Sequence, residues 1–152
     1  LQVTSLDWRN SRWMTSLDCL LLLFATSPPA LHTLEIEYDE RMVRSTEEQE
    51  KALQLLTSLQ NLKFSYCERM QSLPQGLHRL SSLKELRVVS CPEIRWMPRE
   101  GLPVSLRKLY MNPRSAEIDE QIEKIKRTNP DLSVQDYSPI SISELDLSAF
   151  FA

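Results

Sequence analysis

Residues 59–74 read LQNLKFSYCERMQSLP, and residues 83–98 read LKELRVVSCPEIRWMP. When Leu83 is placed on Leu59, apolar residues or cysteine coincide at seven positions. The first set is Leu59, Leu62, Phe64, Cys67, Met70, Leu73 and Pro74, and the second set is Leu83, Leu86, Val88, Cys91, Ile94, Met97 and Pro98. Such internal similarity at a fixed offset indicates that the chain repeats one structural unit.

The LxxLxL spacing within these stretches extends in both directions. Copies begin near positions 3, 31, 59, 83 and 106, so the step between copies shortens toward the C-terminus. A period of about 20–29 residues with this spacing is typical of leucine-rich repeats. We therefore assign residues 1–114 to about five such repeats.

The LxL core of each copy predicts a short β-strand. Side chains alternate between the two faces of a strand, so both leucines point to the same side. Equivalent strands stack about 4.8 Å apart, and parallel strands need a connection that returns across one face of the sheet. The sequence therefore predicts an α/β fold, a curved solenoid with a parallel sheet on its concave face and helices and irregular segments on its convex face.

Two helices are predicted outside the strands. Ser45 with Glu48 matches a capping box at the start of a helix reaching Leu56, and the run at 17–24 occupies the equivalent place one repeat earlier. We interpret that run as a buried convex helix, since it is too short to span a membrane.

The repeat pattern stops after the fifth copy. Ser115 can cap a helix with Ile118, Ile122 and Ile125 on one face, and Asn129 followed by Pro130 ends it. A solenoid needs an atypical terminal unit to cover its last core face. We predict that 115–134 is this C-terminal cap, a helix plus a short extended piece, and that 135–152 is a flexible acidic tail.

Composition argues against several classes of function. The 18 Lys and Arg and the 21 Asp and Glu give a net charge of −3, without the cluster of basic residues that nucleic-acid binding requires. No apolar run approaches the roughly 20 residues of a membrane span. The three cysteines form no CxxC pair, so no metal site is predicted, and with two glycines the chain has no phosphate-binding loop. We expect no cofactor, no catalytic residues and a cytoplasmic location, and a first residue other than Met suggests part of a longer chain.

The string LTSLQNLKFSYCERMQSLPQGLHRLSSLKELRVVSCPEIRWMPREGLPVSLRKL, residues 56–109, resembles a known family. Its pattern LxxLxxLxLxxCxxMxxLP is similar to the C-terminal repeats of plant intracellular nucleotide-binding leucine-rich-repeat (NLR) disease-resistance proteins, in particular the grass coiled-coil class. The resemblance is strong over about 55–110 and absent from the C-terminal tail, 135–152. It implies an immune receptor segment that senses a pathogen effector or a modified host protein and restrains the receptor's nucleotide-binding module.

Three alternatives remain at this point. The repeat end of an F-box ubiquitin-ligase adaptor would use similar cysteine-bearing repeats to bind substrates. An extracellular receptor would favour Asn where Cys67 and Cys91 stand, together with glycosylation sequons and disulfide caps, which are missing. An enzyme would need catalytic groups gathered in a pocket, and no motif in the sequence suggests one.

The outward positions of the predicted strands form the candidate surface for a protein partner. These candidates are Asp7, Arg9, Glu35, Glu37, Lys63, Ser65, Glu85, Arg87, Lys108 and Tyr110. Arg87 and Tyr110 are the favoured contacts, because Arg and Tyr are enriched among binding hot spots. The alternative interpretation is a solvated strand face with cross-strand ion pairs.

Four other residues carry predictions of their own. Trp8 lies at an inward strand position and is predicted to be core. Trp96 is predicted to pack beneath a loop, with an exposed recognition role as the alternative. Cys67 is interpreted as a buried thiol that bonds the turning backbone, with Cys91 in the same role one repeat later.

Overall fold

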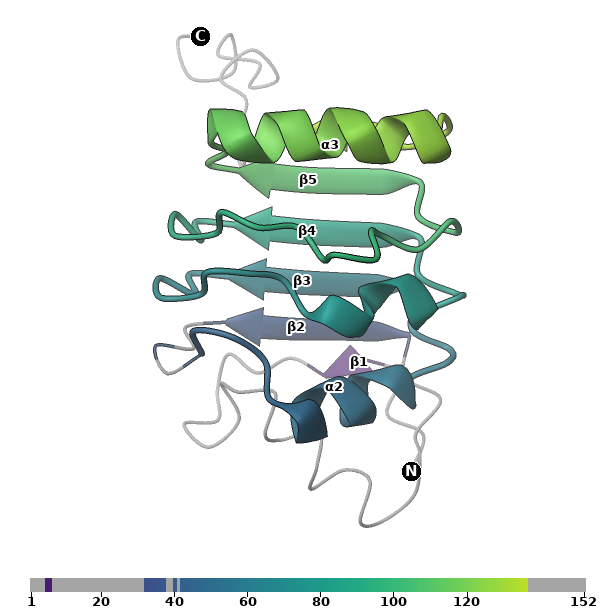
Figure 1. Ribbon diagram of the computed structural model, residues 1–152. Helices are drawn as coiled ribbons and strands as arrows, with labels where there is room; N and C mark the ends of the chain where they lie inside the picture. The colour runs from purple at the N-terminus through teal and green to yellow at the C-terminus, as the bar shows by residue number, and fades with distance from the viewer. Residues whose placement is uncertain (1–4, 7–31, 38–39, 41, 137–152) are drawn as a thin grey trace, which may run out of the picture.

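The structure is a computed structural model that describes residues 5–6, 32–37, 40 and 42–136 of the 152. Its strands are β1 (Ser5–Leu6), β2 (Thr33–Glu37), β3 (Asn61–Ser65), β4 (Glu85–Val89), β5 (Lys108–Asn112) and β6 (Ser133–Gln135). Its helices are α2 (Glu47–Gln54), the 3₁₀ helix η1 (Gln75–Arg79) and α3 (Ala116–Thr128). The sheet has the strand order β1-β2-β3-β4-β5-β6, and every pair is parallel. The predicted α/β class with a parallel sheet is confirmed (Figure 1).

The strand register follows the repeat alignment. Leu34 pairs with Leu62 and Leu62 with Leu86, and the pairing of Leu86 with Leu109 continues the row. The offsets between aligned copies in the sequence are therefore the offsets between paired residues in the sheet, from Ser5↔Thr33 to Glu85↔Lys108. These leucines are 0–1% exposed, because the LxL alternation places them all on the inner side of their strands.

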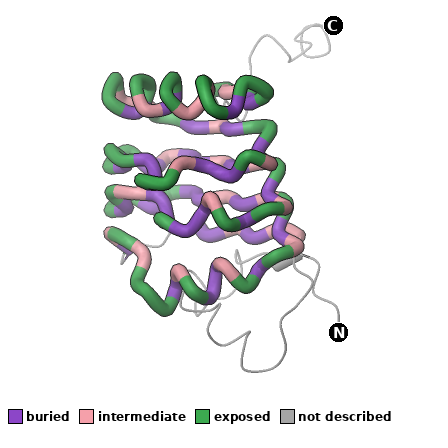
Figure 2. The backbone as a smooth tube through the Cα atoms, turned by 45° about the vertical axis from the view of Figure 1, so that its right-hand side comes forward, coloured by how far each residue is buried: buried purple, intermediate pink, exposed green. Residues whose placement is uncertain are grey.

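The described segments of the connections after β2, β3 and β4 return across the inner side of the sheet. Figure 1 shows α2 and η1 lying in front of the strands, and Figure 2 shows buried positions along the strands and the segments packed on them. Leu53 of α2, Leu73, and Leu77 of η1 are fully buried in this layer. The core therefore lies between the sheet and these connections, and no described segment covers the opposite face, which is called the open face below.

The start of α2 corrects one prediction. The capping box is formed by Thr46 and Gln49 rather than by Ser45 and Glu48. Thr46 Oγ1 accepts from the N–H of Gln49 at 3.2 Å, and Gln49 Oε1 accepts from the N–H of Thr46 at 2.8 Å. Ser45, freed from capping, donates its hydroxyl to the carboxylate of Glu50. The predicted helix at 17–24 lies outside the described residues.

The C-terminal end agrees with the sequence in its local structure. Ser115 caps α3 by accepting from the N–H of Ile118 at 3.3 Å. Ile118 and Ile122 are buried, and the amide of Asn129 donates to the carbonyl of Leu106 at 3.0 Å. The helix lies at the β5 end of the sheet (Figure 1), and β6, which begins one position later than the predicted extended piece at 132–134, pairs with β5.

Within the described residues, no helix is long and apolar enough to cross a membrane.

Candidate protein-interaction face

The open face of the sheet consists of the outward side chains of β2 to β5, arranged by the register in three rows. The first row is Thr33, Asn61, Glu85 and Lys108; the second is Glu35, Lys63, Arg87 and Tyr110; the third is Glu37, Ser65, Val89 and Asn112. Neighbours within a row are about 4.8 Å apart, and successive rows are about 6.6 Å apart. The register thus brings eight of the candidate residues onto one surface.

Arg87 is at the centre of a fixed group on this face. Its Nη2 lies 2.7 Å and its Nε 2.8 Å from Glu85 Oε1, two positions earlier on the same strand. Its guanidinium carbon lies 5.0 Å from the centre of the Tyr110 ring, its register partner on β5. The carboxylate and the ring hold the guanidinium in one orientation. The two residues favoured from sequence are therefore in contact.

A shallow hollow of about 260 Å³ lies beside this group. Glu35, Lys63, Glu85 and Arg87 contribute to its lining together with Thr33, Asn61 and Leu62. Lys63 Nζ lies 3.9 Å from Glu37 Oε1, a diagonal cross-strand ion pair of the kind that the alternative interpretation expects. The surface is polar and alternates in charge, which suits a protein surface of complementary pattern.

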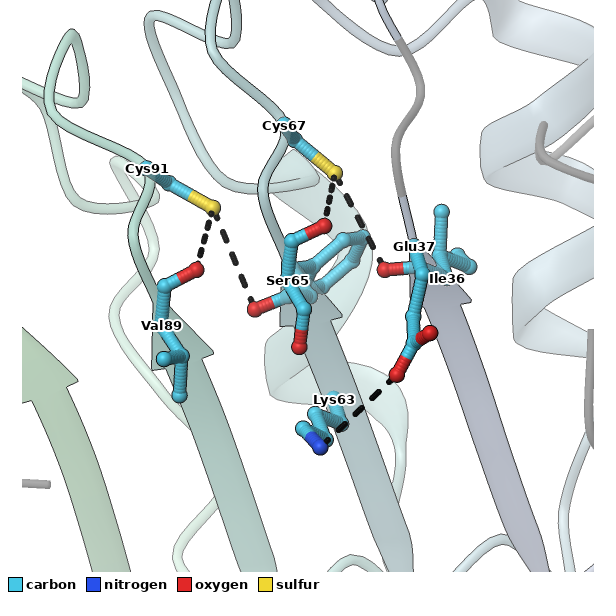
Figure 3. Close-up of polar contacts among 8 residues, drawn as sticks. Ile36, Glu37, Lys63, Ser65, Cys67, Val89 and Cys91 are labelled. Atoms are coloured by element: carbon cyan, nitrogen blue, oxygen red, sulfur yellow. Dashed lines mark hydrogen bonds and ion pairs between the residues drawn. The ribbon is translucent and has the colours of Figure 1, made fainter. Parts of the chain in front are cut away.

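The third row differs from the sequence expectation. Ser65 is 1% exposed and Glu37 is 8% exposed, so neither is available as an open surface contact. Ser65 is flanked in the sheet by Glu37 and by Val89, which is also buried (Figure 3). Asn112, at the end of the same row, is exposed because the pairing of β6 with β5 stops at Tyr110. Ser65 and Glu37 thus lie on the outward side of their strands, as the alternation predicts, but both side chains are buried.

The remaining candidates divide into two groups. Lys108 is exposed in the first row, where it pairs in register with Glu85. Asp7 and Arg9 lie outside the described residues, as does Trp8, and their predicted places stay predictions. Partner binding by any of these residues also stays a prediction.

Cys67 and Cys91 follow the ends of β3 and β4, and both are buried thiols outside any disulfide. The Cys67 thiol is shared between the carbonyls of Ser65, at 3.6 Å, and Ile36 on the preceding strand, at 3.8 Å. Cys91 repeats the arrangement with Val89, at 3.4 Å, and Phe64, at 3.8 Å (Figure 3). Their predicted role in bonding the turning backbone is confirmed.

The Cys67 thiol also acts on Cys91. A hydrogen bond from the Cys67 side chain lowers the pKa of Cys91 below its ordinary value, and backbone hydrogen bonds add to this effect while burial opposes it. Within the described part of the chain, no cluster of three or more His, Cys, Asp or Glu residues could hold a metal ion.

The exposure of Trp96 differs from the sequence prediction. It is 59% exposed, so the prediction that it packs beneath a loop is wrong. Its equivalent in the preceding repeat is Ser72, with which it forms an isolated parallel bridge. A polar residue at the equivalent position was the sequence signal for an outward side chain, because equivalent positions of a repeat share their orientation.

No protein-family model matches this sequence, and no curated protein matches it significantly.

Proposed function

We propose that this chain is a leucine-rich-repeat solenoid that serves as the recognition segment of a plant intracellular immune receptor of the NLR class. Its open sheet face would be the concave surface that binds a pathogen effector or a modified host protein. The same segment would restrain the nucleotide-binding module of the receptor until that protein is bound. The proposal assigns the protein to the cytoplasm and gives it no catalytic activity.

The repeat register supports the solenoid part of this proposal. Each strand pairs with the strands of the copies before and after it, as expected where repeats contact only their neighbours. The thiols of Cys67 and Cys91 bond equivalent carbonyls, so the cysteine of the LxxLxLxxC pattern has one structural role in both copies. The resemblance to the NLR repeats rests on this same pattern.

The observation that carries the binding function is the Glu85, Arg87 and Tyr110 group. The guanidinium is already oriented by a carboxylate and a ring, and orienting a side chain before binding reduces the entropy lost when a partner arrives. The adjacent hollow of about 260 Å³ could receive one partner side chain. A mixed-charge, preorganised surface of this kind favours protein recognition over small-molecule binding.

The test compares binding of effector proteins and host proteins, in a yeast two-hybrid panel and by biolayer interferometry, to the chain and to Arg87→Glu/Lys108→Glu. We expect the double charge reversal to abolish binding, because a reversed pair repels the surface that the original pair attracted. The thermal unfolding midpoint should stay within a few degrees, since both residues lie on the surface.

A matched control reverses two charges away from the open face, Lys51→Glu/Arg69→Glu, both exposed in the connections between strands. This control should bind as the unmodified chain does. Equal loss of binding in both variants, or loss of fold in the Arg87/Lys108 variant, would place recognition elsewhere.

A further inference from the structure

A second, larger hollow lies on the side of the molecule that carries the connections. It has a volume of about 770 Å³, within the range of roughly 300–1,000 Å³ that ligand pockets occupy. It is lined by Trp96, Met97, Arg99 and Glu100 from one connection, Ser72 and Gln75 from the preceding one, Arg44 and Ser45 before α2, and Gln121 of α3. The hollow thus crosses successive connections, at right angles to the strands.

Cross-connection hydrogen bonds fix the walls of this hollow. The amide of Gln121 accepts from the N–H of Met97 at 2.8 Å and donates to the carbonyl of Arg95 at 3.0 Å. Gln75 Oε1 accepts from the N–H of Arg99 at 2.9 Å, and Ser72 bridges to Trp96. The side-chain amides of Gln75 and Gln121 are therefore already hydrogen-bonded within the protein.

The groups left to meet a ligand are an indole and two guanidinium groups. Trp96 is 59% exposed, and Arg44 and Arg99 are both exposed. No salt bridge joins either arginine to a carboxylate within the described residues. With Glu100 as the single acid, the lining carries a net positive charge. This chemistry fits a peptide that offers carboxylates beside a large apolar side chain.

Residues 137–152 of this chain have that chemistry. They read YSPISISELDLSAFFA and contain Glu144 and Asp146, Leu145 and Leu147, Phe150 and Phe151, and no Lys or Arg.

Their starting point lies at the first turn of α3, the helix that also carries Gln121. Asp136 Oδ1 is held by Arg114 Nη2 at 2.8 Å, and Arg114 Nε lies 3.1 Å from Asp119 in the first turn of α3. Gln121, on the wall of the hollow, follows Asp119 by two positions, about 3 Å further along the helix axis but on roughly the opposite side of the helix. The hollow extends from α3 to the connection after β2, about 20 Å at roughly 4.8 Å per strand. The segment after Asp136 reaches roughly 50 Å when extended, so length does not prevent it from crossing the hollow.

We propose that the hollow around Trp96 is a docking site for the acidic, aromatic segment 137–152 of the same chain. Phe150 and Phe151 supply the apolar contact with the indole, and Glu144 and Asp146 pair with Arg44 and Arg99. The site lies away from the open sheet face, so its occupancy is independent of the protein recognition proposed above.

Acrylamide quenching of tryptophan fluorescence in the full chain tests this proposal. The contribution of Trp96 is obtained as the difference between each variant and its counterpart carrying Trp96→Phe. If the segment covers the indole in half of the molecules or more, Phe150→Ala/Phe151→Ala should raise the quenching constant of Trp96 about twofold or more. Ser141→Ala/Ser143→Ala, in the same segment, is the matched control and should leave it unchanged. An unchanged constant in the phenylalanine variant overturns the proposal.

A charge exchange tests the polar half of the site. Arg44→Glu/Arg99→Glu should raise the quenching constant as the phenylalanine change does, and adding Glu144→Lys/Asp146→Lys should return it to the original value. Failure of the second pair to restore protection would show that these carboxylates do not pair with the two arginines. The Arg87→Glu/Lys108→Glu variant should quench as the unmodified chain does, so failure here is distinct from failure of the recognition face.

Discussion

Glu50 and Gly76 are joined across two connections of the molecule: the carboxylate of Glu50, on α2, accepts from the backbone N–H of Gly76, at the start of η1, at 2.8 Å. The other carboxylate oxygen accepts from the N–H of Gln75 at 2.7 Å. A single side chain therefore satisfies two N–H groups that a helix start leaves without intrahelical partners. A Cβ at position 76 would lie 2.9 Å from Glu50 Oε2 and 2.7 Å from Gln54 Nε2, so a larger residue there requires the ends of these two side chains to move.

Gly76→Ala should lower the free energy of unfolding by about 1–3 kcal/mol, because the methyl group displaces the carboxylate that bonds the η1 backbone. Urea denaturation with a matched Glu50→Gln variant measures this. The glutamine keeps the shape but presents an amide to one of the two N–H donors, so it should also destabilise. An unchanged midpoint in both Gly76→Ala and Glu50→Gln would mean that the Glu50 contact contributes nothing to stability.

Leu62 and Leu86 occupy the same inward position in successive strands and are both fully buried. Either leucine changed to alanine should cost about 2–5 kcal/mol, through lost apolar burial and the cavity that remains. Thr57→Ala, at an exposed position, should change stability by no more than about 0.5 kcal/mol. Similar costs for the leucine and threonine variants would contradict the placement of the core.

Ser65 has the one buried side-chain oxygen without a hydrogen-bond partner in the described part of the chain. Ser65→Ala should therefore leave stability unchanged or raise it by up to about 1 kcal/mol, since it removes a polar group whose desolvation is not compensated. Chemical denaturation of this variant beside Ser90→Ala, a half-buried serine directly after β4, makes the comparison. A clear loss of stability in Ser65→Ala would reveal a partner for the hydroxyl.

The lowered pKa of Cys91 has a consequence for stability at alkaline pH. Because the folded pKa lies below the unfolded one, the thiolate of Cys91 contributes stability that is present above the unfolded pKa and lost as pH falls through the folded pKa. Cys67→Ala removes the hydrogen bond that contributes most to this shift. The stability lost in Cys67→Ala should thus be larger above the ordinary cysteine pKa than at neutral pH.

Thiolate absorbance, followed as pH rises in a Cys19→Ser background, gives an independent reading. The titration midpoint of Cys91 should move to higher pH in Cys67→Ala than in the unmodified thiol pair. A midpoint that stays in place would show that the Cys67 thiol does not act on its neighbour.

The parts of the structure that the sequence predicted are those fixed by period alone. Side chains alternate between the two faces of a strand, so Leu62 and Phe64 lie on the same side. The repeat step then places Leu86 and Val88 beside them. The repeat period does not predict the burial of Ser65, because that burial depends on the side chains at the paired positions of the two neighbouring strands. The N-cap is Thr46 and not Ser45. The sequence did not distinguish them, because Ser and Thr are adjacent here and both are favoured N-cap residues.

The sequence predicts which residues lie on the candidate face, but not which contacts their side chains make. Alternation assigns Arg87 and Tyr110 to the same side of the sheet, and the register makes them neighbours. Whether the guanidinium would turn to Glu85, to Tyr110 or to solvent depends on side-chain conformations that no repeat pattern encodes. The orientation of Trp96 follows that of the polar Ser72 at the equivalent position, with which it forms a bridge, and not its own aromatic character.

The connections differ in length while the strands remain aligned. Thr33 pairs with Asn61, Asn61 with Glu85 and Glu85 with Lys108, so each of these steps along the chain is shorter than the one before it. Residues can therefore be added or removed behind the sheet without displacing any side chain in front of it. In such a molecule the two surfaces can vary independently: substitutions on the strands alter what the front contacts, and insertions behind alter the outline that the back presents. A partner that binds across both surfaces would have to accommodate two separate sources of variation.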